Sequence, residues 1–414
     1  ARPDVEWRAG AAHRHRAGAP QGRAHRHPGR GHLPRGRRER GVHPEGAGAE
    51  NYAYNIAKRL VKKGHNISVL CSTHQGRNQK EIIDGIQIVR SKPDFCISTT
   101  PVKFNLPFKL LQMLRKSDFD LINLNFYLVY YPDIAALIGR ACRIPSVLTY
   151  HNDMFKDEFL TGLIINLYHR SIEPLTLRLT KRVIVASPYC YNESRFLKPF
   201  KGKTIWIPPG VDTKRYNVGN SFAIHNTYNL PRSAKIVLFV GVLSQAYKHK
   251  GVDYLLKSLP RVLASIKDVY LVLVGRGDMI TEYKTMCTSL GISEQVIFTG
   301  FVDENQLVNY YRSSNVVILP STTVQEGFGM VLIEANACGK PVIGTKIGGI
   351  QYVIRDSENG LLVPPRDSEA LAEAITKVLQ DDNLSRRMGQ RGKEITDGYS
   401  WDKLAEQTEQ VYME

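Results

Sequence analysis

Two stretches decide the fold of this chain: Asn315-Val-Val-Ile-Leu-Pro320 and Glu326-Gly-Phe-Gly-Met-Val-Leu-Ile-Glu334. The first is a short apolar run, which is typical of a buried strand, and the second places glycines before an apolar helix. Because the first amides of such a helix are free, this strand–turn–helix pattern is suited to an anion. The two glutamates favour a ligand that also carries hydroxyl groups. A sugar nucleotide has both features.

The composition predicts two domains and no membrane-spanning helix. The 414 residues are 43% hydrophobic, which is enough for the cores of two α/β domains. No apolar run is long enough to span a bilayer, and the first residues lack the apolar centre of a signal peptide. The six cysteines form no CxxC pair, so we expect reduced thiols in a cytoplasmic protein.

The first 44 residues differ from the rest. They hold 11 Arg, no Lys and 6 His with few large apolar side chains, so we expect segment 1–44 to be disordered. A nucleic-acid-binding arm, a metal-binding tract and a targeting presequence are alternatives. The arm lacks the interleaved aromatics that stack on bases, and the histidine spacing fits no metal site, so we expect no nucleic-acid partner. The abrupt appearance of lysine from Lys58 onward favours translation in the wrong frame or an artefact of gene assembly.

From Gly48 onward, helical patterns alternate with apolar runs. A first helix is expected over residues 50–63, with Gly64 as its stop. Further helices are expected at Phe108–Arg115, Asp133–Ala141 and Phe159–Leu179. Strands are expected at Ile67–Cys71, Ile86–Val89, Leu121–Leu124, Ser146–Tyr150, Val183–Ala186 and Thr204–Ile207. This alternation predicts an α/β domain with a parallel, doubly wound sheet.

A second alternation follows an irregular connection around residues 208–231. Its expected strands are Ile236–Val240, Tyr270–Val274, Val296–Thr299, Val316–Leu319 and Val342–Thr345. Four helices are expected with it. One begins at Val252, a second ends at Ala337, a third runs from the cap Asp367 to about Leu379, and a fourth begins near Asp402. Ligands of such sheets bind beyond the carboxyl ends of the strands.

Glu326 and Glu334 are poorly spaced for hydrolysis. On one helix, eight positions would separate them by about 12 Å, whereas glycoside hydrolases hold their two carboxyl groups about 5–9.5 Å apart. We therefore expect the two side chains to contact different parts of one extended ligand. Solvent-facing helix glutamates are the alternative, which the neighbouring glycines and buried strand make less favourable.

At these residues the sequence resembles glycosyltransferase family 4, whose members are retaining enzymes of the GT-B fold that use nucleotide-diphosphate sugars. The resemblance extends from Gly48 to the C-terminus and rests on Pro320-Ser321 and the Glu-x7-Glu pattern. It implies two facing Rossmann-like domains, an acceptor-side domain at 45–212 and a donor-binding domain at 213–395. A C-terminal helix in 396–414 would cross back to the first domain.

The resemblance also assigns roles at the donor site. Glu334 would bind the ribose hydroxyls, and Glu326 would hold the donor sugar. The backbone that would hold the sugar and diphosphate belongs to Gly327, Phe328, Gly329 and Met330.

A second candidate segment is the loop Gly241-Val-Leu-Ser-Gln-Ala-Tyr-Lys-His-Lys-Gly251. The family places an Arg after the first glycine and a Lys before the last, both on the leaving diphosphate. Lys250 matches the lysine, but Val242 stands where the arginine is expected. Either Lys248 supplies the second cation or one phosphate contact is missing. These cations would stabilise developing charge, so no metal ion or other cofactor would be needed.

The remaining candidates are single positions. Gly275 lies in a Gly-x-Gly turn that fits a structural turn equally well, and Phe301 and Val302 resemble the family segment that contacts the nucleotide base. His151, at the carboxyl end of a buried strand, corresponds to the family histidine that contacts the donor sugar near the reacting centre. Gly48 belongs to a loop resembling Gly-Gly-x-Glu, which approaches the donor phosphates or the acceptor.

The sequence thus predicts a metal-independent, retaining glycosyltransferase of carbohydrate biosynthesis, acting on a glycan, lipid-linked or small-molecule acceptor. A phosphorylase- or synthase-like GT-B enzyme and a non-enzymatic nucleotide-sugar-binding relative are the alternatives. Lys103–Lys116 is apolar on one side and basic at intervals. This pattern fits peripheral contact with the inner face of a membrane, and it fits a helix packed on the sheet equally well.

Overall fold

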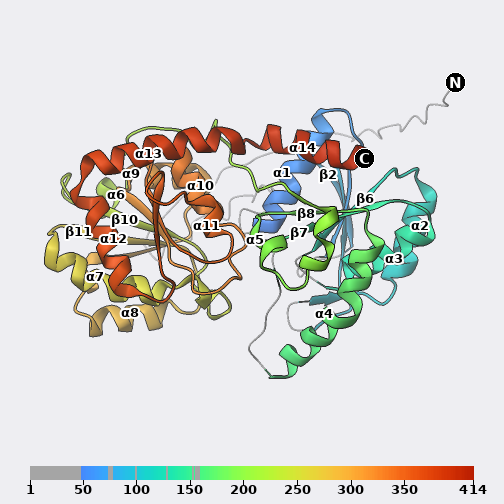
Figure 1. Ribbon diagram of the computed structural model, residues 1–414, viewed down its shortest axis with the longest axis horizontal. Helices are drawn as coiled ribbons and strands as arrows, with labels where there is room; N and C mark the ends of the chain where they lie inside the picture. Colours follow the sequence, from blue (N-terminus) through green and yellow to red (C-terminus); the bar gives the residue numbers. More distant parts are fainter. Residues whose placement is uncertain (1–47, 73–77, 98–99, 127–128, 152, 154–158) are drawn as a thin grey trace, which may run out of the picture. The chain divides into compact units, whose positions relative to one another are not determined.

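The computed structural model describes residues 48–72, 78–97, 100–126, 129–151, 153 and 159–414 (Figure 1). The disorder expected for segment 1–44 concerns residues outside these ranges. Within them the chain is α/β, and each half contains a parallel sheet with helices on both faces.

The second half is built on a six-stranded parallel sheet. Its strands are β10 (Lys235–Val240), β11 (Val269–Val274), β12 (Val296–Gly300), β13 (Val316–Leu319), β14 (Val342–Thr345) and β15 (Gly360–Val363). They are arranged in the order β12-β11-β10-β13-β14-β15, so the direction of winding reverses between β10 and β13. In doubly wound sheets this reversal opens the crevice in which ligands bind.

Helices cover both faces of this sheet. Figure 1 shows α7 (Val252–Ser265) and α8 (Ile280–Ser289) on one face, with α9 (Glu304–Ser313) and α10 (Met330–Ala337) on the other. The remaining elements are α6 (Ala223–Tyr228), α11 (Ile350–Val353), α12 (Ser368–Gln380), α13 (Asp382–Thr396) and the 3-10 turns Gln245–Lys250, Ser293–Gln295 and Asp397–Tyr399. The Asp367 carboxylate accepts hydrogen bonds from Glu369 N and Ala370 N, which confirms the predicted cap.

The first half contains a four-stranded parallel sheet in the order β6-β7-β8-β9. Its strands are β6 (Ile122–Phe126), β7 (Ser146–Tyr150), β8 (Arg182–Val185) and β9 (Thr204–Trp206). Alternate side chains point to opposite faces. Val147 packs in one cluster with residues of α1 (Gly48–Lys62) and α14 (Trp401–Met413). Leu148 packs in another with residues of α3 (Tyr131–Ala141) and α4 (Phe159–Leu179).

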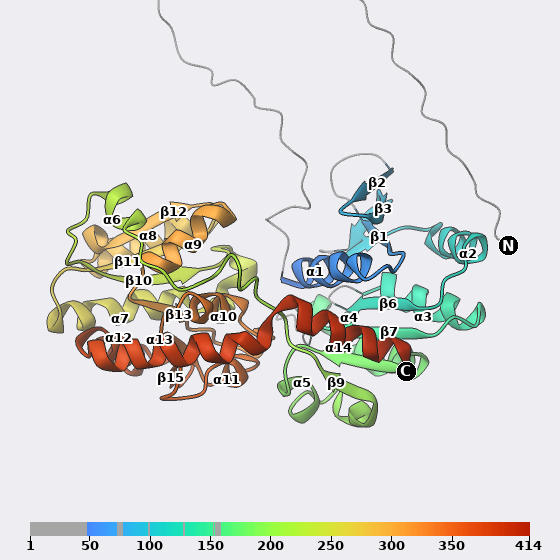
Figure 2. The same ribbon diagram turned by 90° about the horizontal axis from the view of Figure 1, so that it is seen from above.

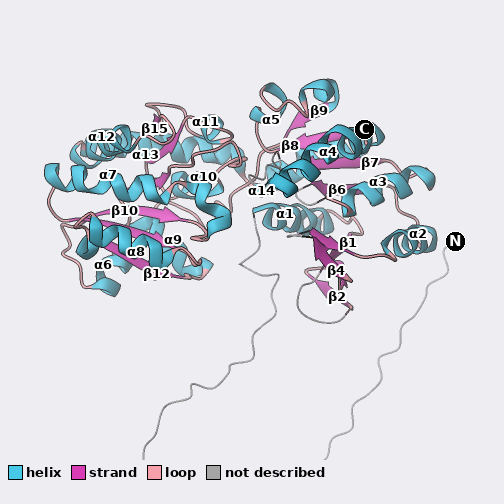
Figure 3. Ribbon diagram, turned by 90° about the horizontal axis from the view of Figure 1, so that it is seen from below, coloured by secondary structure: helices cyan, strands magenta, loops and turns pink. Residues whose placement is uncertain are grey.

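The figures agree with this division into faces. Seen from above, α1 and α14 lie side by side over the strands (Figure 2), and seen from below α4 lies in front of them (Figure 3). The Trp401 ring lies 5.8 Å from the Tyr52 ring of α1, and Arg59 Nε donates to Asp402 at 2.7 Å. The last helix therefore returns to the first half of the chain.

Two parts of the first half are antiparallel, which the sequence interpretation missed. β3 (Ile86–Ser91) pairs in parallel with β1 (Ser68–Ser72) but antiparallel with β2 (Gln79–Ile83). The turn Asp84-Gly85 has positive φ at both residues, as a two-residue hairpin requires. β4 (Phe95–Ile97) and β5 (Thr100–Val102) form a second antiparallel pair.

The other elements of the first half are α2 (Leu106–Lys116), α5 (Tyr189–Asn192) and the 3-10 turn Lys198–Lys203. The α/β fold class is confirmed, as are the main strands and helices. The expected irregular connection around residues 208–231 contains the short helix α6. Among the described helices, none has the length and apolar character needed to cross a membrane.

Candidate functional site

The winding reversal brings Lys250 and Glu326 together. Lys250 ends the loop after β10, and Glu326 lies in the loop after β13, so both are at the carboxyl ends of the two strands that flank the reversal. Lys250 Nζ donates to Glu326 Oε2 at 2.8 Å. Both side chains are mostly buried, yet each keeps part of its surface exposed (18% and 13%), so a ligand has access to the pair.

The charge of Glu326 depends on this pair. Burial alone would raise the pKa of its carboxyl, but the positive charge and hydrogen bond of Lys250 outweigh burial and lower the pKa. Ser321 Oγ adds a longer contact of 3.4 Å to the same oxygen. The carboxylate is therefore ionised at neutral pH and acts only as a hydrogen-bond acceptor.

Two glycines let a neighbouring turn pack beneath Glu326. Gly349 N donates to Glu326 O at 2.9 Å, and a Cβ on Gly349 would lie 1.9 Å from Gly327 O. A Cβ on Gly348, where φ is +52°, would lie 2.6 Å from Glu326 O. The backbone at 326–327 is thus fixed by a close approach that only glycine permits.

Helix α10 begins directly after this loop. Its cap Gly329 has φ +89°, and Met330 is the first helical residue. The first amides of the helix lie at the positive end of its dipole, and one of them, Leu332 N, donates to Gly329 O at 2.9 Å. Gly48, predicted in a loop, is instead the first residue of α1, and a Cβ built on it would lie 3.5 Å from Met330 Sδ at the start of α10. Glu326 precedes the helix, and of the two glutamates only Glu334 lies on it.

Glu334 is half-buried on α10 and paired with a residue that the sequence interpretation missed. Tyr311 Oη, on α9, donates to Glu334 Oε2 at 2.7 Å. Burial raises the pKa of Glu334 to about 7, against the opposing effect of the Tyr311 hydrogen bond. This carboxyl therefore titrates near neutrality, unlike that of Glu326.

The other predicted donor residues lie in the loops that follow β10, β11 and β12. A Cβ on Gly275 would lie 1.8 Å from Gly241 O, so this glycine is required by the packing of two loops. Phe301 is partly exposed, and the Arg276 guanidinium lies 5.2 Å from its ring. Lys248 Nζ is 3.6 Å from Glu282 of α8, and the structure does not bring it to Glu326. Val302 is partly buried against the core of the second half.

His151 lies directly after β7 in the first half. Its Nε2 is 3.2 Å from Asn125 Oδ1, and its ring meets the Tyr52 ring edge-on at 5.6 Å. Burial lowers the pKa of His151 to about 4, so the imidazole is neutral at physiological pH. It offers hydrogen bonds rather than a positive charge.

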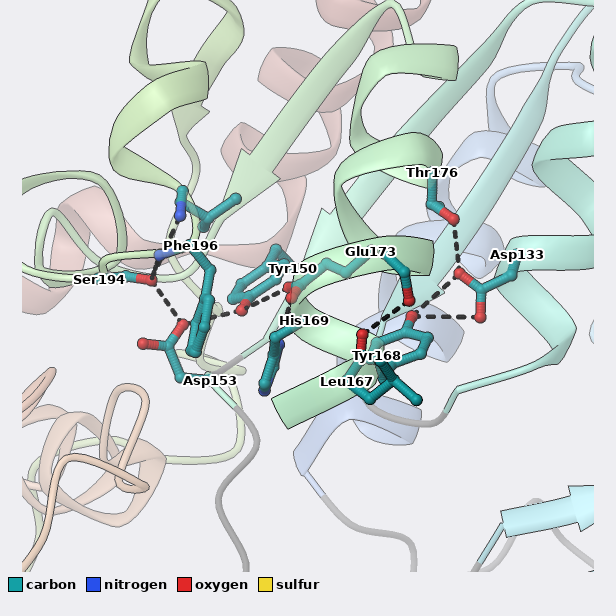
Figure 4. Close-up of polar contacts among 12 residues, drawn as sticks. Asp133, Tyr150, Asp153, Leu167, Tyr168, His169, Glu173, Thr176, Ser194 and Phe196 are labelled. Carbon is teal, nitrogen blue, oxygen red and sulfur yellow. Dashed lines mark hydrogen bonds and ion pairs between the residues drawn. The ribbon is translucent and has the colours of Figure 1, made fainter. Parts of the chain in front are cut away.

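A buried polar network begins at Tyr150, the last residue of β7 (Figure 4). Tyr150 Oη is 2.8 Å from Asp153 Oδ1 and 3.1 Å from Glu173 Oε1, and Ser194 Oγ donates to Asp153 at 2.7 Å. His169 Nδ1 contacts the other oxygen of Glu173. Burial raises the pKa of the Asp153 carboxyl, against the opposing effect of its hydrogen bonds with Ser194 and Tyr150.

Metal binding was not expected, and the described residues contain no group of three His, Cys, Asp or Glu side chains able to hold an ion.

The residues missed from sequence, Tyr311 and Asn125, are joined to the site only by the fold. Tyr311 is 23 positions before Glu334 and reads as an apolar residue of a helix. No local signal marks either residue.

Two family models match this chain. One, described as Glycosyltransferase Family 4, matches residues 46–215, and one described as Glycosyl transferases group 1 matches residues 220–395. The chain belongs to glycosyltransferase family 4. The predicted family and the prediction of a glycosyltransferase enzyme are confirmed.

Relatives and solved structures agree with this family. A phosphatidyl-myo-inositol mannosyltransferase of Mycobacterium leprae is 28% identical over 88% of this chain and 92% of its own length. An uncharacterized glycosyltransferase of Methanocaldococcus jannaschii is 28% identical over 86% and 92%. The structure of sucrose-phosphate synthase from Thermosynechococcus elongatus superposes with a TM-score of 0.71 at 26% identity, covering 89% of this chain and 93% of that one. The GT-B fold of the glycosyltransferase is thus confirmed.

Proposed function

We propose that this glycosyltransferase moves a sugar from a nucleotide-diphosphate donor to an acceptor, with retention of configuration and without a metal ion. The observation that carries the proposal is the Lys250–Glu326 pair. It lies where the strand order reverses and in the loop that leads into α10, so a cation, an acceptor for sugar hydroxyls and the first amides of a helix lie at one edge of the sheet.

Each group has a distinct proposed role. Lys250 and the amides of Gly327–Met330 hold the diphosphate and stabilise the charge that develops on it as the sugar leaves. Glu326 accepts hydrogen bonds from the sugar, and Glu334 accepts them from the ribose. Phe301 and Val302 lie along the nucleotide base, and Gly275 supports the loop beneath the phosphates. His151, being neutral, donates or accepts a hydrogen bond at the sugar near the reacting carbon.

The acceptor is approached from the first half of the chain, near Gly48 and His151. The named relatives include a mannosyltransferase that acts on phosphatidyl-myo-inositol and a synthase of sucrose phosphate. They support a hydroxyl acceptor on a polyol or sugar, carried by a lipid in one case. We therefore propose a lipid-linked or carbohydrate acceptor, and a cytoplasmic enzyme in peripheral contact with the inner face of a membrane.

The first test is thermal unfolding with UDP, GDP, ADP and their common sugar conjugates. We expect one nucleotide family to raise the melting temperature of the wild-type chain. Glu334→Ala should abolish this shift, whereas Glu294→Ala, which removes an exposed glutamate after α8, should keep it. Nuclear magnetic resonance of the anomeric proton of the product then reports retention or inversion.

The same assay separates the alternatives. A shift with sugar phosphates and orthophosphate, but with no nucleotide, would replace the proposal with a phosphorylase-like activity. Nucleotide-sugar binding without transfer to any lipid or sugar acceptor, and without slow donor hydrolysis, would replace it with a binding protein.

A further inference from the structure

Helix α4 exposes a row of large apolar side chains. On its buried side it packs Tyr168 and Leu177 in the core and also buries His169, Glu173 and Thr176, which are at most 6% exposed. The large apolar side chains that it exposes are Leu163 (60%), Ile164 (59%), Leu167 (66%), Ile172 (47%) and Leu175 (49%). We call these five residues the α4 outer stripe.

The buried polar side is fully engaged in hydrogen bonds. Tyr168 Oη donates to Asp133 at 3.0 Å and Thr176 Oγ1 donates to the same carboxylate at 2.6 Å, both reaching from α4 to α3 (Figure 4). Glu173 contacts His169 and Tyr150. These bonds fix the rotation of the helix about its axis. The exposure of the apolar side is therefore a consequence of the fold and not of a loosely attached helix.

Helix α7 faces water in the usual way. In α7 the apolar residues Leu255, Leu256 and Leu259 are buried, and Arg261 lies exposed. A helix in contact with water normally buries its apolar stripe in this manner. A contiguous apolar surface on the outside is instead typical of a site that meets a protein or a membrane.

The charge around the α4 outer stripe is positive. Arg170 and Arg178 are exposed on α4, and Glu173, the acidic residue of the helix, is buried. A second apolar group in the same half has a similar character: Phe104 and Phe108, at the start of α2, are 73% and 69% exposed. On α4, where Glu173 is the acidic residue and is buried, apolar side chains flanked by arginine match the acyl–headgroup boundary of an anionic bilayer.

We infer that the α4 outer stripe docks on the surface of an anionic lipid bilayer. The area of the stripe favours a bilayer over a second copy of the chain. Its five residues expose roughly 500 Å², which is within the range of functional apolar patches, whereas a stable protein interface takes about 800 Å² from each partner. A helix lying flat on a bilayer needs only one apolar side.

The inference deepens the acceptor side of the proposed function, on which it rests for its biological meaning. A glycosyltransferase held on a bilayer by its first half would meet acceptors that are themselves carried by lipids. The donor site is in the second half, so donor binding and bilayer binding can be measured separately and can fail separately.

The experiment is co-sedimentation of the full chain with vesicles of phosphatidylcholine alone or mixed equally with phosphatidylglycerol. We expect binding to the anionic vesicles, weakened at least tenfold by the double variant Leu163→Gln/Leu167→Gln. Ile82→Gln, which alters a residue that is 73% exposed on β2, is the matched control and should bind like wild type. Arg170→Gln/Arg178→Gln should remove the preference for anionic vesicles.

Circular dichroism and the nucleotide-dependent thermal shift should be unchanged in all of these variants, because the altered side chains are exposed. Failure of the wild-type chain to sediment with either vesicle would overturn the inference. So would a Leu163→Gln/Leu167→Gln variant that binds as tightly as Ile82→Gln. A dimer seen by size-exclusion chromatography, lost in that variant and indifferent to vesicles, would assign the stripe to self-association instead.

Discussion

Replacing Glu334 with glutamine should stabilise the folded chain at alkaline pH. Burial raises the pKa of this carboxyl to about 7, so the folded state keeps its proton at pH values where the unfolded chain has lost it. The resulting stability is complete below the unfolded pKa and is lost as the pH rises through the folded pKa. A glutamine at this position has no proton to lose.

The size of the effect follows from the two pKa values. The rise from 4.5 to about 7 is a difference of about 2.5, and 1.36 kcal/mol for each unit of pKa gives about 3.4 kcal/mol at full ionisation. The unfolded glutamate is already partly ionised at pH 5, and the residue is only half-buried. We therefore expect wild type to lose about 2 kcal/mol more than Glu334→Gln between pH 5 and pH 8.

The assay is urea unfolding of wild type, Glu334→Gln and Glu294→Gln at pH 5 and pH 8, followed by circular dichroism. Comparing wild type with each variant cancels the other titrating groups. Glu294→Gln, at an exposed position, should follow wild type at both pH values. Equal stability differences between wild type and Glu334→Gln at the two pH values would show that Glu334 ionises at its ordinary pKa, which would refute the reasoning.

Three further predictions concern the loops around the Lys250–Glu326 pair. Glu326→Gln should bind the free nucleotide diphosphate severalfold more tightly, because Lys250 loses its competing carboxylate, while kcat/KM should fall at least about 100-fold. Calorimetry measures the binding and initial rates measure kcat/KM; weaker diphosphate binding would contradict the prediction. Val242→Arg should tighten donor binding about tenfold by adding a charge-assisted hydrogen bond, and an unchanged Kd would show that no phosphate contact is missing. Gly349→Ala should destabilise the fold by about 2 kcal/mol or more, since its Cβ would lie 1.9 Å from Gly327 O; a melting temperature equal to wild type would refute this.

The sequence predicted five of the six strands of the second-half sheet, because they are short runs of β-branched residues between helical patterns, but it missed β15. β13 and β14 were placed at their observed positions for this reason. The antiparallel β2 was missed although Asp84-Gly85, a hairpin signal, stands beside it. A regular alternation of strands and helices favoured an all-parallel interpretation, which the local turn chemistry overrode.

The candidate site was predictable only where its residues lie in one continuous motif. Glu326 and Glu334 are marked by the glycines between them, but Tyr311 reaches Glu334 from another helix. The contact between Lys250 and Glu326 required the strand order, since 76 positions separate them in the chain. Likewise, periodicity placed α4 correctly but could not tell which of its sides meets water. That side is set by hydrogen bonds to Asp133 and Tyr150, which belong to other elements.

Under the proposed function, the Lys250–Glu326 pair would let the site bind an anion although its lysine is already paired with a carboxylate. In the described structure the lysine is neutralised by the glutamate, and Val242 adds no charge. Under the proposed function, a diphosphate entering at the start of α10 would meet backbone amides first and then compete with Glu326 for Lys250. If the lysine turned to the phosphate, the glutamate would be released to accept hydrogen bonds from the sugar. A nucleotide without its sugar would leave that buried carboxylate unpaired, so the exchange favours the complete donor over the nucleotide alone.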